Sequence, residues 1–363
     1  MKHTYIYIMS VLASMMLFCG CDVHQWPERD ADIDPDPVIP PSDAPKVKIP
    51  MSLEYETDFY VWKHYYDPKL GQVEEADPSI NIFPEYPGAS SKYDNIVPSC
   101  ILQVYVKVFP ASNNSVCVAE HSFTMDINGT YDTDIEMEMP GENTYDVVVW
   151  SQLLETSQSK PFYDPSSFSQ IHIINGNYDG NTNYRDGFRG RIRIDAFTGI
   201  NNRYVVRMQR PMGKFELVTT DLSEFLDRET VQRRLTTRAS ADDYRVVISY
   251  PNYYPSSYEA MDDRLENSIS GMSFETRMTV TGESEASLGF DYVMINNIMD
   301  GGVQARVDVY RPDGTHVAGS STLTIPIRRD YHTLLRGTFL TMDGGGGVGI
   351  DPGFNGDHNV STW

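Results

Sequence analysis

The chain is short of positive charge. Among its 363 residues, 29 are Lys or Arg and 51 are Asp or Glu, which gives a formal net charge of −22. Nucleic acids and anionic lipid surfaces are bound by basic faces, so this balance argues against both partners. Hydrophobic residues still make up 40% of the chain, enough for folded cores. At roughly 150 residues per domain, the length indicates about two domains.

Recognised catalytic motifs are also missing. There is no G-x-S-x-G, H-E-x-x-H, phosphate-binding loop or dinucleotide fingerprint, and no Lys-Ser or Lys-Thr follows the run Gly344–Gly347. The histidines have none of the spacing that zinc sites use, and we expect them on the surface or in strands. They are His3, His24, His64, His121, His172, His316, His332 and His358. We therefore expect no enzyme, no cofactor and no metal centre.

One segment partly follows a calcium-loop pattern. Asn175, Asn177 and Asp179 stand at alternate positions before Gly180, and Asp186 follows. Oxygen ligands at that spacing suit a hard cation such as Ca²⁺. However, Asn replaces the first Asp of the pattern and Asp replaces its terminal Glu. An Asn- and Gly-rich surface loop is the simpler interpretation, and the four ligating residues remain a weak calcium candidate.

Cysteine is scarce, with four residues in the chain. Cys100 and Cys117 fall on two strand-like runs joined by a turn, and a hairpin centred there puts Cys117 opposite Val108 and Cys100 near Met125. The two cysteines would then lie roughly 26 Å apart along the strands. A disulfide requires Cα atoms within about 7 Å. We expect buried free thiols, with a disulfide as the less favoured alternative.

The first 21 residues are typical of a secretory signal. Lys2 precedes an apolar run over 5–18 that is shorter than the roughly 20 residues of a membrane-spanning helix. A retained membrane anchor is the alternative interpretation. Gly20-Cys21 resembles a bacterial lipobox, although Phe18 stands where Leu is usual. The resemblance implies that Cys21 is lipidated, with palmitate-type acyl chains, and becomes the mature N-terminus at a membrane.

Residues 22–45 form a predicted tether. They contain six Pro, six Asp and one Glu, with few apolar residues. Such a segment stays extended and solvated, and it can hold a folded body up to ~75 Å from the lipid at about 3.1 Å per residue.

The remaining sequence has patterns that are typical of β-structure. Alternation with period two, as in Leu102, Val104, Val106 and Val108, predicts strands buried on one face. The predicted strands are 47–49, 52–55, 100–109, 116–123, 134–139, 145–150, 191–194, 204–208, 214–218, 244–250, 272–280, 288–295, 303–310, 317–327 and 333–341. Residues 58–98 form a long stretch rich in turn signals.

A single convincing helix begins at Asp221, which can cap the first turn with Glu224 three residues on. Many short strands with one helix predict an all-β protein of two tandem β-sandwich domains. We place these domains at 46–200 and 201–345, with the short helix in the second. A Gly-rich C-terminal tail follows over 346–363.

An aromatic segment at 250–258 admits two interpretations. Its tyrosines can stack against a carbohydrate, because flat rings offer large contact area at low entropy cost. Alternatively, the rings seal one end of a sandwich, which is the more common role.

Four stretches of the chain resemble a known family. They are 21–28, 208–222, 290–293 and 325–354, and the last contains Ile325-Pro326-Ile327-Arg328-Arg329. The chain is similar there to the fimbrillin-associated anchor proteins of type V pili in Bacteroides-type bacteria. This resemblance implies two transthyretin-like (Greek-key) domains and a surface-exposed outer-membrane lipoprotein that holds or assembles a fimbria. The implied partners are fimbrial subunits and the membrane.

In that family, an arginine-directed protease trims a first strand from shaft subunits, and a neighbour fills the groove by β-strand addition. An anchor keeps its lipid and its first strand, which would be Val47–Tyr55 here. No arginine lies between Arg29 and Arg185, which favours an anchor over a shaft subunit. A surface glycan-binding lipoprotein is the alternative function.

Overall fold

The computed structural model describes residues 45–341, except 68–70, 76–91, 98, 142, 175–177, 197–201 and 297–300. Over these residues the protein consists of β-strands, one α-helix α2 (Leu222–Gln232) and two 3-10 turns, η1 (Asn183–Arg185) and η3 (Ala241–Asp243). The predicted all-β class with one short helix is confirmed, and the transthyretin-like strand order stays a prediction. The expected signal peptide and tail, and the tether up to residue 44, lie outside the described residues.

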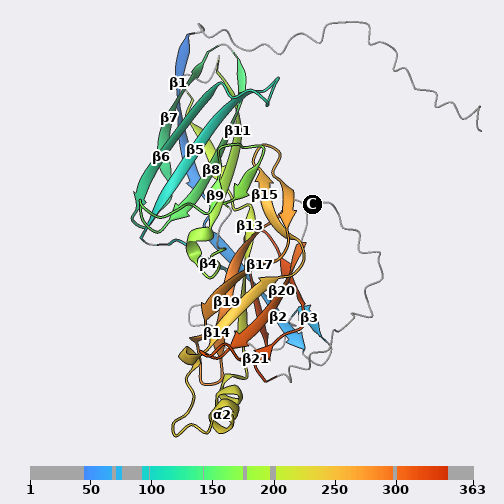
Figure 1. Cartoon of the computed structure of the whole chain (residues 1–363). Coiled ribbons are helices and arrows are strands. Elements are labelled where there is room, and N and C mark those ends of the chain that lie inside the picture. Colours follow the sequence, from blue (N-terminus) through green and yellow to red (C-terminus); the bar gives the residue numbers. More distant parts are fainter. Residues whose placement is uncertain are drawn as a thin grey trace, which may run out of the picture. The chain divides into compact units, whose positions relative to one another are not determined.

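Two sheets form the first sandwich, with strand orders β12-β1-β7 and β11-β8-β5-β6 (Figure 1). The strands are β1 (Lys46–Tyr55), β5 (Cys100–Pro110), β6 (Ala119–Ile127), β7 (Thr133–Pro140), β8 (Thr144–Leu154), β11 (Gly187–Asp195) and β12 (Tyr204–Met208). The alternating residues of β5 (Leu102, Val104, Val106 and Val108) are fully buried in the shared core, as their spacing predicts.

Two larger sheets form the second sandwich. One has the order β18-β19-β13-β23-β2-β3, with β4 also paired to β2, and the other has the order β17-β14-β20-β21, with β22 also paired to β20. The strands are β2 (Asp58–Asp67), β3 (Gln72–Glu75), β4 (Lys92–Asp94), β13 (Met212–Thr219), β14 (Arg245–Tyr250), β17 (Met272–Arg277), β18 (Thr279–Val280), β19 (Ala286–Met294), β20 (Gly301–Tyr310), β21 (His316–Gly319), β22 (Leu323–Ile327) and β23 (Tyr331–Gly337). Their core also buries Leu222, Phe225 and Leu226 of α2.

A small fifth sheet has the order β16-β15-β10-β9. Its strands are β9 (Tyr163–Asp164), β10 (Ile171–Ile173), β15 (Tyr254–Glu259) and β16 (Arg264–Ile269). Tyr163, Ile171 and Tyr258 of this sheet share a separate apolar cluster with Trp150 of β8 and Tyr292 of β19. The fifth sheet therefore packs against strands from both sandwiches.

The chain passes from the first sandwich to the second twice, and it returns once, between β4 and β5. β1 lies in the first sandwich, and β2, two residues later, pairs in parallel with β23 in the second. Likewise β12 pairs in parallel with β1, and β13 follows in the second sandwich. Segments 46–67 and 204–219 thus each contribute to both sandwiches. The predicted boundary between 46–200 and 201–345 falls at residues 197–201, outside the described residues, and stays a prediction.

The predicted hairpin of β5 and β6 forms with a register two residues from the expected one. Cys100 faces Ile127 and Val108 faces Ala119, because the connecting turn is longer than the sequence indicates. Both cysteines are free thiols, as expected, but only Cys100 is buried. Cys117 is exposed because it precedes β6 in the turn, where its thiol donates to the carbonyl oxygen of Ala119.

Other strand predictions also need correction. The strand expected over 272–280 is divided into β17 and β18, which lie in different sheets. The turn-rich stretch after residue 58 begins with the ten-residue strand β2. The single strand expected over 317–327 is divided into β21 and β22, which both pair with β20. The last strand ends at Gly337 rather than at residue 341. The turn expected at Asp313-Gly314 is present, and Gly314 supplies its positive φ of 85°.

Candidate functional site

The predicted first strand is the central strand of its sheet. β1 pairs antiparallel with β7 along Lys46–Leu53 and parallel with β12 along Met51–Tyr55. The strand continues through Pro50, where the sequence indicates an interruption. At that position β1 has a paired neighbour only on the β7 side, and proline is tolerated in strands that have an open edge.

The inward face of β1 is apolar. Ile49, Met51 and Leu53 are at most 1% exposed and lie in the core of the first sandwich with Met137 of β7 and Val206 of β12. Burial of a large apolar side chain contributes about 1.5–3 kcal/mol. Removing β1 would therefore expose an apolar groove between β7 and β12.

The outward face of β1 carries ion pairs in solvent. The amine of Lys48 lies 3.1 Å from the carboxylate of Glu136, and the amine of Lys46 lies 4.0 Å from that of Glu138. The hydrogen bond to Glu136 raises the pKa of Lys48. Exposed pairs of this kind contribute little to stability, so the buried face holds β1 in place.

A buried arginine joins the two passages between the sandwiches. Arg210, between β12 and β13, is fully buried, and its Nε donates to both carboxylate oxygens of Asp186 at 2.8 and 2.9 Å. Its two terminal nitrogens donate to the backbone carbonyls of Glu56, Thr57 and Asp58 at 2.7–3.2 Å. These carbonyls belong to the turn between β1 and β2. One guanidinium therefore binds both segments that lead from the first sandwich to the second.

A second buried pair lies nearby. The Nε of Arg185 is 3.2 Å from Asp291, which also accepts hydrogen bonds from the hydroxyls of Tyr178 and Tyr250 at 2.6 Å. Burial raises the pKa of the Asp291 carboxyl, and the charge of Arg185 opposes that rise. Each buried carboxylate is thus balanced by a buried arginine, which limits the cost of removing both charges from water.

The calcium candidate is only partly covered by the structure. Asn175 and Asn177 lie outside the described residues, and the backbone carbonyl of Asp179 accepts a hydrogen bond from Arg185. The carboxylate of Asp186 is bound by Arg210. Among the described residues, no group of three or more His, Cys, Asp or Glu side chains is placed to hold a metal ion.

The aromatic segment at 250–258 lies mainly in the interior. Tyr250, Tyr254 and Tyr258 are at most 1% exposed, and only Tyr253, at 66%, reaches the solvent. The Tyr254 hydroxyl donates to the backbone carbonyl of Tyr292 at 2.8 Å. The rings therefore seal the body, as the second interpretation expects, and they form no exposed stacking platform.

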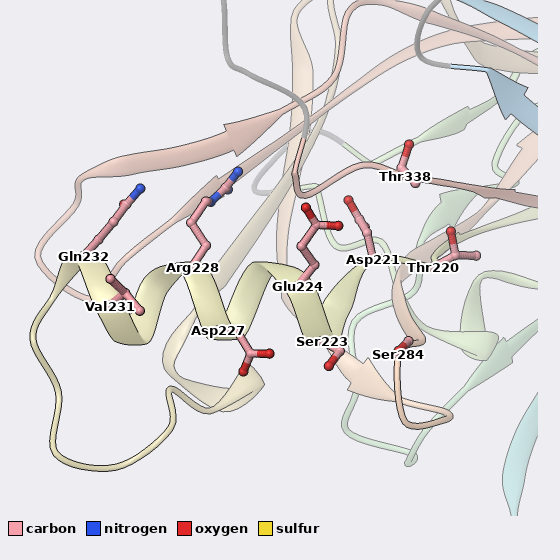
Figure 2. Close-up of a pocket in the computed structure, with 10 residues that line it drawn as sticks. All are labelled: Thr220, Asp221, Ser223, Glu224, Asp227, Arg228, Val231, Gln232, Ser284 and Thr338. Atoms are coloured by element: carbon pink, nitrogen blue, oxygen red, sulfur yellow. The ribbon is translucent and has the colours of Figure 1, made fainter.

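Helix α2 borders a shallow groove beside the end of the described chain (Figure 2). Asp221, Glu224 and Arg228 project from the helix on the side of Thr338, whereas Asp227 points away. The residues that line the groove are Thr220, Asp221, Ser223, Glu224, Asp227, Arg228, Val231, Gln232, Ser284 and Thr338. All of them except Val231 are polar or charged.

Asp221 precedes α2 but makes no side-chain capping bond, so the predicted capping role is wrong. Its carboxylate instead accepts hydrogen bonds from the backbone amides of Leu340 and Thr341, at 3.1 and 2.7 Å. Further along the helix, the guanidinium of Arg228 donates to the backbone carbonyl of Leu340 at 2.7 Å. Asp221 and one side chain of α2 thereby satisfy the backbone of a segment that no longer belongs to β23.

A family model covers most of the chain. It matches residues 85–362 and is described as a family of unknown function, DUF6562. The chain belongs to this family. The matched range begins after β1, β2 and β3, and it includes the whole of the second passage between the sandwiches.

The chain is also similar to solved structures, among them a fimbrial anchor protein. That protein is Mfa2 of Porphyromonas gingivalis, with 10% identity, coverage of 75% of this chain and 82% of that chain, and a TM-score of 0.36. A candidate cell adhesion protein from Bacteroides eggerthii has 10% identity, coverage of 81% and 88%, and a TM-score of 0.39. A candidate polysaccharide-binding protein from Bacteroides thetaiotaomicron (DUF1812) has 10% identity, coverage of 75% and 80%, and a TM-score of 0.38. No curated protein matches the chain in sequence.

The sequence of this member of the DUF6562 family did not indicate the long-range hydrogen bonds that Arg210 and Asp221 make. Arg210 and Asp221 stand near the ends of predicted elements, and nothing in their local pattern indicates partners 154 and 120 residues away. Cys21, the predicted lipidation site, lies outside the described residues. In the part of the chain that is described, no helix has the length and apolar character to cross a bilayer.

Proposed function

We propose that this chain is a lipid-anchored protein of the cell outer membrane that anchors a type V fimbria or initiates its assembly through β-strand addition. Cys21 would carry the lipid, residues 22–45 would span the distance from the membrane, and the two sandwiches would present the binding surface to fimbrial subunits. The proposal includes no enzymatic step. It rests on the sequence resemblance and on the buried, central position of β1 in its sheet.

The observation that carries the proposal is the integration of β1. This strand lies between two partners, buries Ile49, Met51 and Leu53, and has no arginine nearby in the sequence. A shaft subunit would need a first strand that a protease can release. A strand that is both buried and free of arginine suits the subunit that stays at the membrane and begins the fibre.

Strand addition requires an unpaired edge, and β7 provides the longest one in the sheet of β1. Over the described residues β7 pairs with β1 alone, along eight positions from Thr133 to Pro140. Its outward residues are Asp134, Glu136 and Glu138, which are exposed. An incoming strand with Lys or Arg at alternate positions would complement this edge, because opposite charges on neighbouring strands stabilise the pairing.

A genetic experiment tests the proposal. We expect that cells without the protein release their fimbriae or make fimbriae of abnormal length, and that the intact chain restores attachment. The Cys21→Ala variant, with the same body but no lipid site, should leave fimbriae in the medium. Fimbriae that stay attached and of normal length in the deletion strain would contradict the proposal.

A binding experiment separates the fimbrial function from the glycan alternative. The intact chain should capture fimbrial subunits, and Glu136→Lys with Glu138→Lys should weaken that capture. The control Lys63→Glu, on β2 in the second sandwich, should leave it unchanged. Binding to a glycan array without capture of fimbrial subunits would favour the alternative.

A further inference from the structure

A buried lysine in β13 faces a side-chain amide. Lys214 is 7% exposed, and its Nζ donates to the Oδ1 of Asn183 in η1 at 3.0 Å. The hydroxyl of Tyr292 in β19 donates to the same oxygen at 2.9 Å. The amide carbonyl of Asn183 thus lies between an amine and a hydroxyl donor. This is the arrangement that polarises a carbonyl for attack by a nucleophile.

The surroundings of Lys214 are aromatic. Its Nζ lies 4.3 Å from the ring centre of Phe290 and 5.4 Å from that of Tyr292. Burial lowers the pKa of Lys214 to about 8, although the charge of Glu216 opposes that change. At neutral pH roughly one molecule in ten then carries the neutral amine, which is the nucleophilic form.

A partly buried proton acceptor stands on the same face of β13. Glu216 is two residues from Lys214, and its carboxylate lies 3.3 Å from the Nε2 of His332 in β23. Side-chain hydrogen bonds, among them one from His332, keep the pKa of Glu216 below its usual value despite partial burial. The charge of Glu216 acts on the Lys214 amine, and a carboxylate that stays ionised on the same face of the strand can accept and return a proton during amide exchange.

We propose that Lys214 and Asn183 join in an intramolecular isopeptide bond. The neutral Nζ attacks the Cγ of Asn183, and the hydroxyl of Tyr292 stabilises the negative charge that develops on Oδ1. Glu216 takes a proton from the attacking nitrogen and delivers it to the departing Nδ2. The Cγ–Nδ2 bond breaks, ammonia leaves and a Cγ–Nζ amide forms. No oxidant, reductant or cofactor is consumed.

The bond would connect segments that belong to different sheets. Asn183 lies before β11 of the first sandwich, and Lys214 lies in β13 of the second. The link would close a loop next to Arg210, which binds the same region without a covalent bond. Two kinds of connection, one ionic and one covalent, would then hold the second passage between the sandwiches.

Peptide mass spectrometry of the full-length protein tests the proposal. After trypsin digestion we expect a branched peptide that joins the segments of Asn183 and Lys214. Its mass should be lower than the sum of the two peptides by about 17 Da, the mass of ammonia. Trypsin should not cleave after Lys214. Complete cleavage after Lys214, with no branched peptide, would overturn the proposal.

Matched variants test the chemistry. Lys214→Arg keeps the positive charge but not the nucleophilic amine, and it should eliminate the branched peptide. Glu216→Gln should reduce the branched fraction at least tenfold, as loss of a proton-transfer group does. Lys107 is an internal control, because its Nζ donates to a backbone carbonyl, of Ser166, and lies over the ring of Phe168. It should be cleaved normally, and equal branching in wild type and Glu216→Gln would refute the role of Glu216.

Discussion

The sheet of β1 and the passage at Arg210 are stabilised in opposite ways. β1 buries apolar side chains and leaves its charges in water, where Lys48 and Glu136 are both more than half exposed. At the passage, Arg210 and Asp186 are fully buried and meet at 2.8 Å. Apolar burial tolerates gradual change, whereas a buried charge pair fails when either partner is lost. The difference means that substitutions of similar size should have very different effects in the two regions.

The largest effect is expected at Arg210. Arg210→Met leaves the Asp186 carboxylate buried without its partner and should lower the free energy of unfolding by about 3–5 kcal/mol. Urea denaturation measures this change. The double variant with Asp186→Leu should recover much of the loss, because no buried charge remains unpaired. If Arg210→Met lowers the free energy of unfolding by no more than the loss of an exposed ion pair does, Arg210 does not stabilise the passages between the sandwiches.

A smaller loss is expected in the sheet of β1. Leu53→Ala removes a fully buried side chain and should cost about 2–4 kcal/mol, the range of core truncations. The same denaturation experiment measures it. Val205→Ala on the neighbouring β12 is the control, because Val205 is 41% exposed and should be nearly neutral.

The contact between Asp221 and the segment after β23 should contribute less. Asp221→Ala removes a carboxylate that accepts from two backbone amides and should cost about 2 kcal/mol. Hydrogen exchange should accelerate at Leu340 and Thr341. Glu224→Ala on the same helix is the control, and equal exchange in both variants would show that Asp221 does not hold this segment.

A gain in stability is expected at Asp330. Burial raises the pKa of Asp330 to about 6, from an ordinary value of 3.8. The folded protein therefore binds the proton more tightly, and this contribution to stability, complete below about pH 4, is lost as the pH rises through 6. Asp330→Asn should be about 1 kcal/mol more stable than wild type at pH 7.5 and similar at pH 4. Asn also suits the positive φ of 59° at this position. Urea midpoints at the two pH values check the expectation.

The smallest effect should come from the exposed pairs of β1. Lys48→Ala should leave the urea midpoint unchanged, because both partners of its ion pair are largely in water. Added salt should likewise leave the difference between the variant and wild-type midpoints unchanged. A measurable loss would mean that the outward face of β1 contributes more than its exposure indicates.

The fold follows from the sequence wherever one face of a strand is buried. β5 and β7 have the alternation that such a strand requires, and both were predicted within a few residues. β2 was missed because its sequence, DFYVWKHYYD, is aromatic on both faces and lacks that alternation. Its place between β23 and the β3–β4 edge depends on residues more than 250 positions away, which a local pattern does not contain.

The candidate sites follow from the sequence to a lesser degree. The first strand was anticipated from its strand-like sequence and from the family resemblance, and its central place in the sheet came from the structure. The buried pairs could not be predicted, because Arg210 and Arg185 look like ordinary surface arginines in their local sequence. Only the fold shows that each faces a buried aspartate.

The continuity of β1 and β2 has a mechanical consequence. Two residues join them, and Arg210 holds that turn by three backbone carbonyls. Under the proposed function, tension from the tether enters the first sandwich through β1. Resistance to that tension would depend on the rate at which the hydrogen bonds between β1 and its neighbouring strands break. Force that is transmitted to β2 passes through a turn that Arg210 already stabilises by hydrogen bonds.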